Sequence, residues 1–216
     1  MRSRSRWLEV HSVGQPNIDI NQLLHGCFLL QLNQVKLNLI AAACENMGIG
    51  ANGSLPWRLK KEMAYFTTMT TKINDTSKIN AVIMGRKTWD CIPEKYRPLA
   101  DRVNIVLTHQ VDAYKDKVPK GVIVVSSIQD AIEYIEGRPD IETTWVIGGS
   151  SVYQAAMQHP NCGKIYLTEI QRSFDCDTFF PDIDNQQFHL VDEEEIPGER
   201  QLEGDISYYY RVYKRL

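Results

Sequence analysis

Short apolar runs alternate with segments of helical periodicity from Leu37 to the C-terminus. Six of these runs end at turn residues: "LNLIAAAC", "NAVIMG", "RVNIVLT", "GVIVVSS", "TTWVIGG" and "KIYLTEI". Continuous apolar runs of this length are typical of strands that are buried on both faces of a sheet. Because strands that alternate with helices need right-handed crossovers, the pattern predicts a mostly parallel sheet with helices on both faces.

Apolar residues at helical spacing predict four helices between these strands. The first covers Leu59 to Thr70, and the second, "RKTWDCI", stops before Pro93 because proline cannot continue a helix. In "SIQDAIEYIEG" we expect Ser127 to be the N-cap, with Asp130 at the third helical position and Gly137 just past the end. The fourth, "SSVYQAAMQHP", begins beside two glycines.

The C-terminal segment has a different pattern. "QFHLVDEEEIPGERQLEGDISYYYRVYKRL" predicts two longer strands joined by a polar loop, which would form an antiparallel hairpin. No linker rich in Pro, Gly or Ser separates two large domains. We therefore predict one α/β domain over residues 37–216, with an eight-stranded, mostly parallel sheet, an antiparallel C-terminal strand and helices on both faces.

Residues 1–36 lack this regularity and are predicted to be an extension that is disordered or a leader. "MRSRSRW" is basic and Ser-rich, as a transit peptide can be, although Glu9 and Asp19 follow soon after. The apolar run "CFLL" is too short for a membrane span, which needs ~20 residues. We expect a cytoplasmic protein, or a mitochondrial one if residues 1–36 act as a transit peptide.

Composition excludes several classes of function. The 216 residues carry a formal net charge of -3, which argues against a broad nucleic-acid or membrane surface. The five cysteines are odd in number and show no Cys-x-x-Cys pair, so a disulfide framework does not fit and a reducing compartment is expected. The five histidines are scattered, so we expect no catalytic metal.

The glycine-rich loop "GIGANG", from Gly48 to Gly53, matches G-x-G-x-x-G and follows a predicted strand. A dinucleotide-binding fingerprint also needs a helix that opens directly at the last glycine and an acidic residue about 20 positions on. Here the loop continues into "SLPW", and Pro56 disfavours helix at Leu55. We therefore interpret it as a flexible loop that lies across a ligand, with an ordinary surface turn as the alternative.

Two other junctions between a strand and a helix have the character of phosphate sites. "VIMGRKTW" places Gly85 at a strand end and two cations at a helix start, whereas "VIGGSSVY" offers two glycines and two hydroxyls. Backbone N–H groups and the positive end of a helix favour an anion at such positions. Each junction alone could be an ordinary helix cap, but two on one parallel sheet indicate a dinucleotide pyrophosphate.

Glu62 falls on the apolar stripe of the first predicted helix, together with Leu59, Met63 and Phe66. Burying an unpaired carboxylate costs several kcal/mol even after relaxation, and no cation shares this face. A helix rotated so that Glu62 reaches solvent is one explanation. The other is that its partner is a ligand with adjacent N–H donors, such as an amino-pyrimidine ring, which a carboxylate binds in bidentate fashion.

Several stretches in series resemble the animal-type dihydrofolate reductases: "NMGIGANGSLPW", Glu62 with Phe66, "NAVIMGRKTWDCIPEKYRPL", "RVNIVLT", "WVIGGSSVYQAAM" and "DCDTFFPDID". The match runs from Leu37 to the C-terminus. The resemblance implies the fold of that family and the NADPH-dependent reduction of 7,8-dihydrofolate to tetrahydrofolate, in support of one-carbon metabolism. It also implies binding of antifolates such as methotrexate, and a monomer that needs no nucleic acid or membrane.

The resemblance assigns catalytic roles to Glu62, Trp57, Thr168 and Leu55. Glu62 would hold the 2-amino group and N3 of the pterin, with Thr168 bonded to the carboxylate and Trp57 holding a water. Arg102 would form a fork with the α-carboxylate of the glutamate tail, a geometry that guanidinium offers. The implied substrate-binding residues are Ile40, Glu62, Met63, Phe66, Thr67, Ile92, Pro93, Tyr96, Leu99, Arg102, Ile147 and Thr168.

For the cofactor, the resemblance implies that Gly48 to Ser54 and Tyr153 cover the nicotinamide side. Arg86 to Thr88 and Thr108 would contact the pyrophosphate and the 2′-phosphate. It also implies cis peptide bonds at Gly148-Gly149 and Arg97-Pro98. The implied cofactor-binding residues are Ala42, Gly48, Ile49, Gly50, Ala51, Asn52, Gly53, Ser54, Arg86, Lys87, Thr88, Thr108, His109, Gln110, Gly148, Gly149, Ser150, Ser151, Val152 and Tyr153.

The chain departs from the family pattern at a few positions. Ser126 and Ser127 stand where animal enzymes commonly carry a further Arg, and His109 stands where Arg is frequent, so the 2′-phosphate contact depends on Arg86. Met63 replaces a common Phe, and the segment after Trp57 is one residue shorter than in vertebrate relatives. Two alternatives stay open: a non-catalytic folate or nucleotide binder with this fold, and a reductase of the same fold that acts on a different heterocycle.

Overall fold

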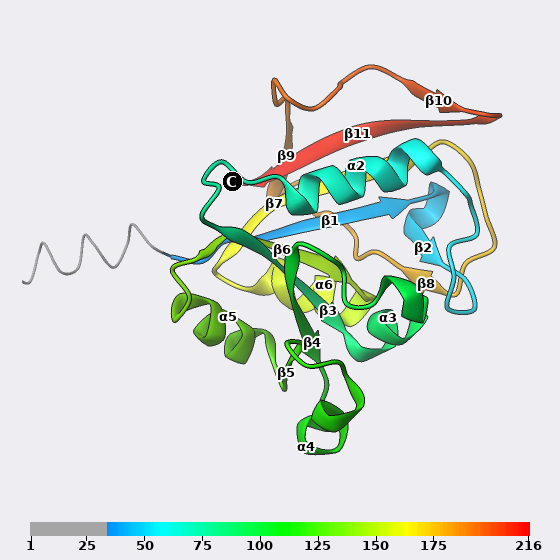
Figure 1. Cartoon of the computed structure of the whole chain (residues 1–216). Coiled ribbons are helices and arrows are strands. Elements are labelled where there is room, and N and C mark those ends of the chain that lie inside the picture. The colour runs from blue at the N-terminus through cyan, green and yellow to red at the C-terminus, as the bar shows by residue number, and fades with distance from the viewer. Residues whose placement is uncertain (1–33) are drawn as a thin grey trace, which may run out of the picture. The chain divides into compact units, whose positions relative to one another are not determined.

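The computed structural model describes residues 34–216, so the prediction of a disordered extension or leader at residues 1–36 falls almost entirely outside the described residues. Val35–Leu216 forms one compact unit. Its main sheet has nine strands, eight of them in the order β10-β11-β7-β1-β6-β3-β4-β5, with β9 paired to β11 (Figure 1). The five pairings from β7 through β1 to β5 are parallel and those of β11 are antiparallel, which confirms the predicted fold class.

All six predicted apolar runs are strands of the main sheet. Its strands are β1 (Leu37–Ala43), β3 (Ile79–Gly85), β4 (Arg102–Leu107), β5 (Ile123–Val125), β6 (Ile141–Gly148), β7 (Cys162–Ile170), β9 (Phe188–Val191), β10 (Gln201–Glu203) and β11 (Ile206–Arg215). A small second sheet joins β2 (Gly48–Gly50) to β8 (Thr178–Phe179). The helices are α2 (Lys60–Thr71), α3 (Arg86–Cys91), α4 (Val111–Tyr114), α5 (Ile128–Glu136) and α6 (Ser150–Gln158), with the 3-10 turns η1 (Glu45–Met47), η2 (Glu94–Tyr96) and η3 (Lys115–Lys117).

The two faces of the main sheet carry separate hydrophobic clusters, because successive side chains of a strand point to opposite faces. Ala81 and Ile83 of β3 pack in one cluster with the buried residues of α5 and α6. Val82 and Met84 pack in the other with Trp89 of α3 and the apolar side chains of α2. Covering both faces explains why these strands are almost continuously apolar.

Helix ends follow local chemistry where the sequence provides it. The Ser127 hydroxyl accepts a hydrogen bond from the Asp130 amide and Gly137 follows the last turn of α5, as predicted. The residue before α2, Leu59, has no capping side chain. Glu203 of β10 supplies the cap instead, since its two carboxylate oxygens accept from the Lys60 and Lys61 amides at 2.6 and 2.8 Å.

The sequence predicted a C-terminal hairpin of two long strands. The second long strand is present as β11, but the prediction of the first is wrong. The segment forms two short strands, β9 and β10, and both pair with β11. Residues 192–200 between them leave the sheet, because "DEEEIPGER" combines five acidic residues with a proline and a glycine. Figure 1 shows this segment looping away above β11.

Candidate active site

The glycine loop is a short hairpin that begins five residues after β1 ends. Ala51 and Ser54 exchange backbone hydrogen bonds of 2.9 and 3.0 Å across Asn52 and Gly53. Both of these central residues have positive φ, 50° and 74°, as a tight two-residue turn with Asn-Gly requires. α2 begins only at Lys60, so the loop does not open a helix and the dinucleotide fingerprint is excluded. The sequence signal for such a turn is the Asn52-Gly53 pair.

The segment that contains β8 is hydrogen-bonded to this loop and to the residue before it. Backbone hydrogen bonds join Asp177 to Gly50 at 3.0 Å and Phe180 to Met47 at 2.8 Å. The Asp177 carboxylate accepts from the Asn52 amide at 2.7 Å. Asp177 is a positioning residue to which sequence reasoning assigned no role, although it lies within the quoted motif "DCDTFFPDID".

Glu62 lies on α2 and is only 5% exposed. Desolvation by burial raises the pKa of its carboxyl group to about 7; the Thr168 hydroxyl lowers the pKa and the Glu203 charge raises it further. Among residues 34–216, Glu62 makes no ion pair. Because Glu62 is buried, the alternative explanation, a helix rotated so that Glu62 reaches solvent, is excluded.

Three elements bring polar groups to the Glu62 side of the molecule. Thr168 of β7, which lies beside Ala42 of β1 in the sheet, donates its hydroxyl to Glu62 Oε1 at 3.3 Å. The buried Trp57 indole N–H has no acceptor within the described part of the chain, so it is available to a ligand or a water. The Tyr153 hydroxyl of α6 donates to the Ile40 carbonyl at 2.8 Å.

The apolar stripe of α2 is rotated relative to the prediction. Met63 is 47% exposed, whereas Glu62 is buried and Tyr65, Phe66 and Met69 pack on the sheet. The stacking of the Tyr65 ring on Tyr210 of β11, with ring centroids 3.9 Å apart, fixes this orientation. The prediction that Met63 belongs to the core-facing stripe of this helix is therefore wrong. Its exposed side chain is free to contact a bound molecule.

Arg102 opens β4 and is held in a defined orientation. Its Nε donates to the Ala100 carbonyl at 2.9 Å and its Nη1 to the Thr70 hydroxyl at 2.7 Å. Thr70 is fully buried on α2, and its hydroxyl also donates to the Phe66 carbonyl at 2.8 Å. Desolvation lowers the pKa of Arg102 somewhat, but a guanidinium stays charged. Sequence reasoning missed Thr70, because a threonine late in a helix carries no distinctive signal.

The two predicted phosphate junctions are neighbours, because β3 and β6 pair in the sheet with Met84 opposite Gly148. A Cβ added to Gly148 or Gly149 would lie 3.1 or 3.2 Å from the Thr88 side chain of the other junction. These glycines therefore let the start of α3 approach the start of α6. The peptide bonds Gly148-Gly149 and Arg97-Pro98 are both cis.

The polar groups at these junctions are not all free for a ligand. Arg86 donates to Asp90 at 2.8 Å, with both side chains about two-fifths exposed. The Ser150 hydroxyl donates to the Phe179 carbonyl at 2.5 Å, which leaves backbone amides and the exposed Ser151 as donors of the second junction. Ser150 and Ser151 also border a groove of about 560 Å³, which Met47 and Asp182 line as well. Glu62 is not among the residues that line this groove.

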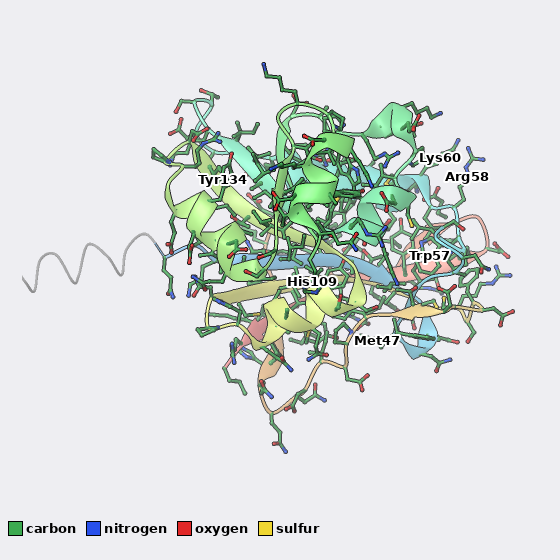
Figure 2. All side chains as sticks on the ribbon, turned by 90° about the horizontal axis from the view of Figure 1, so that it is seen from below. Met47, Trp57, Arg58, Lys60, His109 and Tyr134 are labelled. Carbon is green, nitrogen blue, oxygen red and sulfur yellow. The ribbon has the colours of Figure 1, made fainter. Side chains whose placement is uncertain are left out.

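The other predicted residues are distributed over the elements around this region. Leu55, which was assigned a catalytic role, is 44% exposed in the loop before α2. In Figure 2 Met47 and Trp57 lie toward the end of the molecule to which β1 points in Figure 1, whereas Tyr134 lies toward the opposite end. Thr67 lies on α2, Ile92 and Pro93 follow α3, Tyr96 ends η2, Leu99 lies between η2 and β4, Ile147 lies in β6, and Thr108, His109 and Gln110 follow β4.

Comparison with known proteins gives the same family throughout. The family model described as dihydrofolate reductase matches residues 36–215. A dihydrofolate reductase of Heliothis virescens is 77% identical over 185 residues, which cover 86% of this chain and 100% of that protein. One of Gallus gallus is 43% identical over 83% of this chain and 96% of its own. The solved structure of the Schistosoma mansoni dihydrofolate reductase superposes with a TM-score of 0.73 at 37% identity, over 84% of this chain and 99% of that one.

Proposed function

The chain belongs to the dihydrofolate reductase family, and we propose that it reduces 7,8-dihydrofolate to 5,6,7,8-tetrahydrofolate with NADPH at the site around Glu62. The observation that carries this proposal is the buried carboxylate of Glu62, which has no cationic partner among residues 34–216. Such a group is costly in the free protein and is compensated when a ligand supplies N–H donors. The pterin ring of dihydrofolate presents two adjacent donors, its 2-amino group and N3, which match the two oxygens of a carboxylate.

Arg102 suits the other end of the substrate. Its side chain is fixed by Ala100 and Thr70, so the guanidinium loses little freedom when it binds a carboxylate. We propose that it binds the α-carboxylate of the glutamate tail, and that Met63, Phe66 and Leu99 enclose the ring between the two polar ends. This combination of an inward carboxylate and an oriented guanidinium disfavours a heterocycle that lacks an acidic tail.

The paired junctions support the choice of a dinucleotide cofactor. A side chain at Gly148 or Gly149 would crowd Thr88, so glycine at both positions lets the starts of α3 and α6 lie close together. When bound, NADPH supplies the hydride that reduces the C6–N5 double bond. Arg86, with Lys87 and Thr88, is proposed to contact its phosphates, and the preference for NADPH over NADH depends mainly on Arg86.

Proton delivery follows from the pKa of Glu62. With a pKa of about 7, the carboxyl group populates both protonation states near neutral pH. It can therefore orient the pterin and pass a proton through a water held by the Trp57 N–H toward N5. The Gly48–Ser54 hairpin is proposed to cover the site and exclude bulk water during the reaction.

The setting in which the chain acts is also a proposal. Within the described residues, no helix has the length and apolar character that crossing a membrane requires. We propose a monomer that works in the cytoplasm, or in mitochondria if residues 1–36 direct it there. Tetrahydrofolate then enters one-carbon metabolism and supports thymidylate and purine synthesis.

A single assay tests the proposed activity. Purified full-length chain is mixed with NADPH, with and without dihydrofolate, and the loss of absorbance from reduced nicotinamide is followed. We expect oxidation that requires dihydrofolate, that methotrexate abolishes, and that is slower with NADH at equal concentration. Tight methotrexate binding without turnover would instead favour the non-catalytic binder.

A further inference from the structure

Two cysteines that the proposed reaction does not use lie in direct contact. Cys44 Sγ and Cys176 Sγ are 3.7 Å apart, although the residues are 132 positions apart in the chain. Both are free thiols. A disulfide needs a sulfur–sulfur bond of about 2 Å, so the two atoms have to approach by roughly 1.7 Å.

The pair surrounds Gly48, the first residue of β2 and the start of the glycine hairpin. A Cβ at Gly48 would lie 2.6 Å from Cys176 Sγ and 2.9 Å from Cys44 Sγ, so the two sulfurs pack directly against its Cα. Cys44 immediately follows β1 and Cys176 lies two residues before β8. A covalent link between them would join the segment that leads into the hairpin to the β8 segment that pairs with it.

The two thiols differ in their access to solvent. Cys176 is half-buried, whereas Cys44 is only 4% exposed. Burial and the neighbouring Cys44 raise the pKa of the Cys176 thiol, so its reactive thiolate is scarce at neutral pH. Oxidation should accordingly be slow near pH 7 and faster at higher pH, with Cys176 reacting first.

We propose that Cys44 and Cys176 form an oxidisable dithiol that a peroxide converts to a disulfide at the base of the glycine hairpin. The Cys176 thiolate attacks the peroxide, which gives a sulfenic acid and hydroxide. The Cys44 sulfur then displaces the sulfenic oxygen as water, so two thiols and one hydrogen peroxide give one disulfide and two waters. A dithiol such as dithiothreitol reverses the step by exchange.

The consequence for turnover rests on the proposed function. The hairpin is proposed to open and close over the cofactor, and its base is held in the reduced protein by hydrogen bonds that can break, Asp177 to Gly50 and Phe180 to Met47. The disulfide makes this attachment permanent. We therefore expect kcat to fall at least threefold when the protein is oxidised and to recover when it is reduced.

Peptide mapping tests the bond itself, without reference to activity. The full-length chain is treated with hydrogen peroxide at pH 8.5, its remaining thiols are alkylated, and it is digested with trypsin without reductant. We expect peptide 37–58 linked to peptide 173–200, with no link in Cys44→Ser or Cys176→Ser. The link should be unchanged in Cys91→Ser, because Cys91 is exposed at the end of α3 and packs near Gly53 at the tip of the hairpin, not beside Gly48. Alkylation of both Cys44 and Cys176 after oxidation, or a sulfinic acid at Cys176, would overturn the proposal.

Activity of the same samples tests the consequence. The expected result is a threefold or greater loss of kcat in the oxidised wild type that dithiothreitol restores, and no such reversible loss in Cys44→Ser. Full activity in a sample shown to be linked would overturn the effect on the hairpin. Absence of activity in the reduced protein would contradict the proposed function alone, since the peptide map does not depend on it.

Discussion

Glu62 shows how a single residue can favour function over stability. Burial raises its pKa from 4.5 to about 7, so the folded protein binds a proton that the unfolded chain releases between these values. The stabilisation from this bound proton is complete below pH 4.5 and is lost as the pH rises through about 7. Above that pH the folded protein contains a buried charge without a cationic partner within the described residues.

The free energy of unfolding of Glu62→Gln tests this cost. The variant carries a neutral amide at every pH, so relative to wild type it should gain about 2 to 3 kcal/mol between pH 5 and pH 8.5. Urea denaturation of both ligand-free proteins at the two pH values measures the difference. A difference that does not change with pH would mean that the pKa of Glu62 is not raised.

At the scale of elements, the glycine hairpin depends on the segment beneath it. Gly48 has φ −65° and ψ 132°, which any residue adopts, so its requirement for glycine is steric. The neighbours that exclude a side chain are the Cβ of Cys176, at 2.7 Å from an added Cβ, and the two sulfurs. The hairpin and the β8 segment therefore form one packed unit.

Gly48→Ala should separate these two segments. Overpacking of this kind costs about 1 to 3 kcal/mol, and we expect a comparable loss of unfolding free energy together with reduced turnover. Gly198→Ala is the matched control, because no atom of residues 34–216 lies within 4 Å of an added Cβ there. Equal stability of the two variants in thermal or urea unfolding would contradict the close packing around Gly48.

The elements that the sequence predicted well are those whose pattern is local. The six buried strands and the Ser127 cap of α5 follow from apolar runs and a capping residue. β8 and the pairing of the hairpin with Asp177 depend on partners more than 100 residues away, and a two-residue strand has no periodicity of its own. The rotation of α2, which exposes Met63, is likewise set by the distant Tyr210 of β11.

At the scale of the whole molecule, the site exists only because separate segments meet. Glu62 comes from α2, Thr168 from β7, Trp57 from the loop between β2 and α2, and Arg102 from β4. The sequence indicated most of these residues through the family resemblance, but their mutual geometry follows from the strand order, which places β1 between β6 and β7. Thr70 and Asp177, which hold Arg102 and the hairpin, emerged only from the structure.

The central claim, that Glu62 is buried because the pterin is its partner, is tested most directly by a double-mutant cycle in binding. Kd is measured by calorimetry for folate and for a folate analogue that lacks the 2-amino group, with wild type and with Glu62→Gln. We expect loss of the amino group to weaken binding to wild type at least tenfold, about 1.4 kcal/mol or more, and to change binding to the variant less than threefold. An equal loss in both proteins would contradict the contact between Glu62 and the pterin.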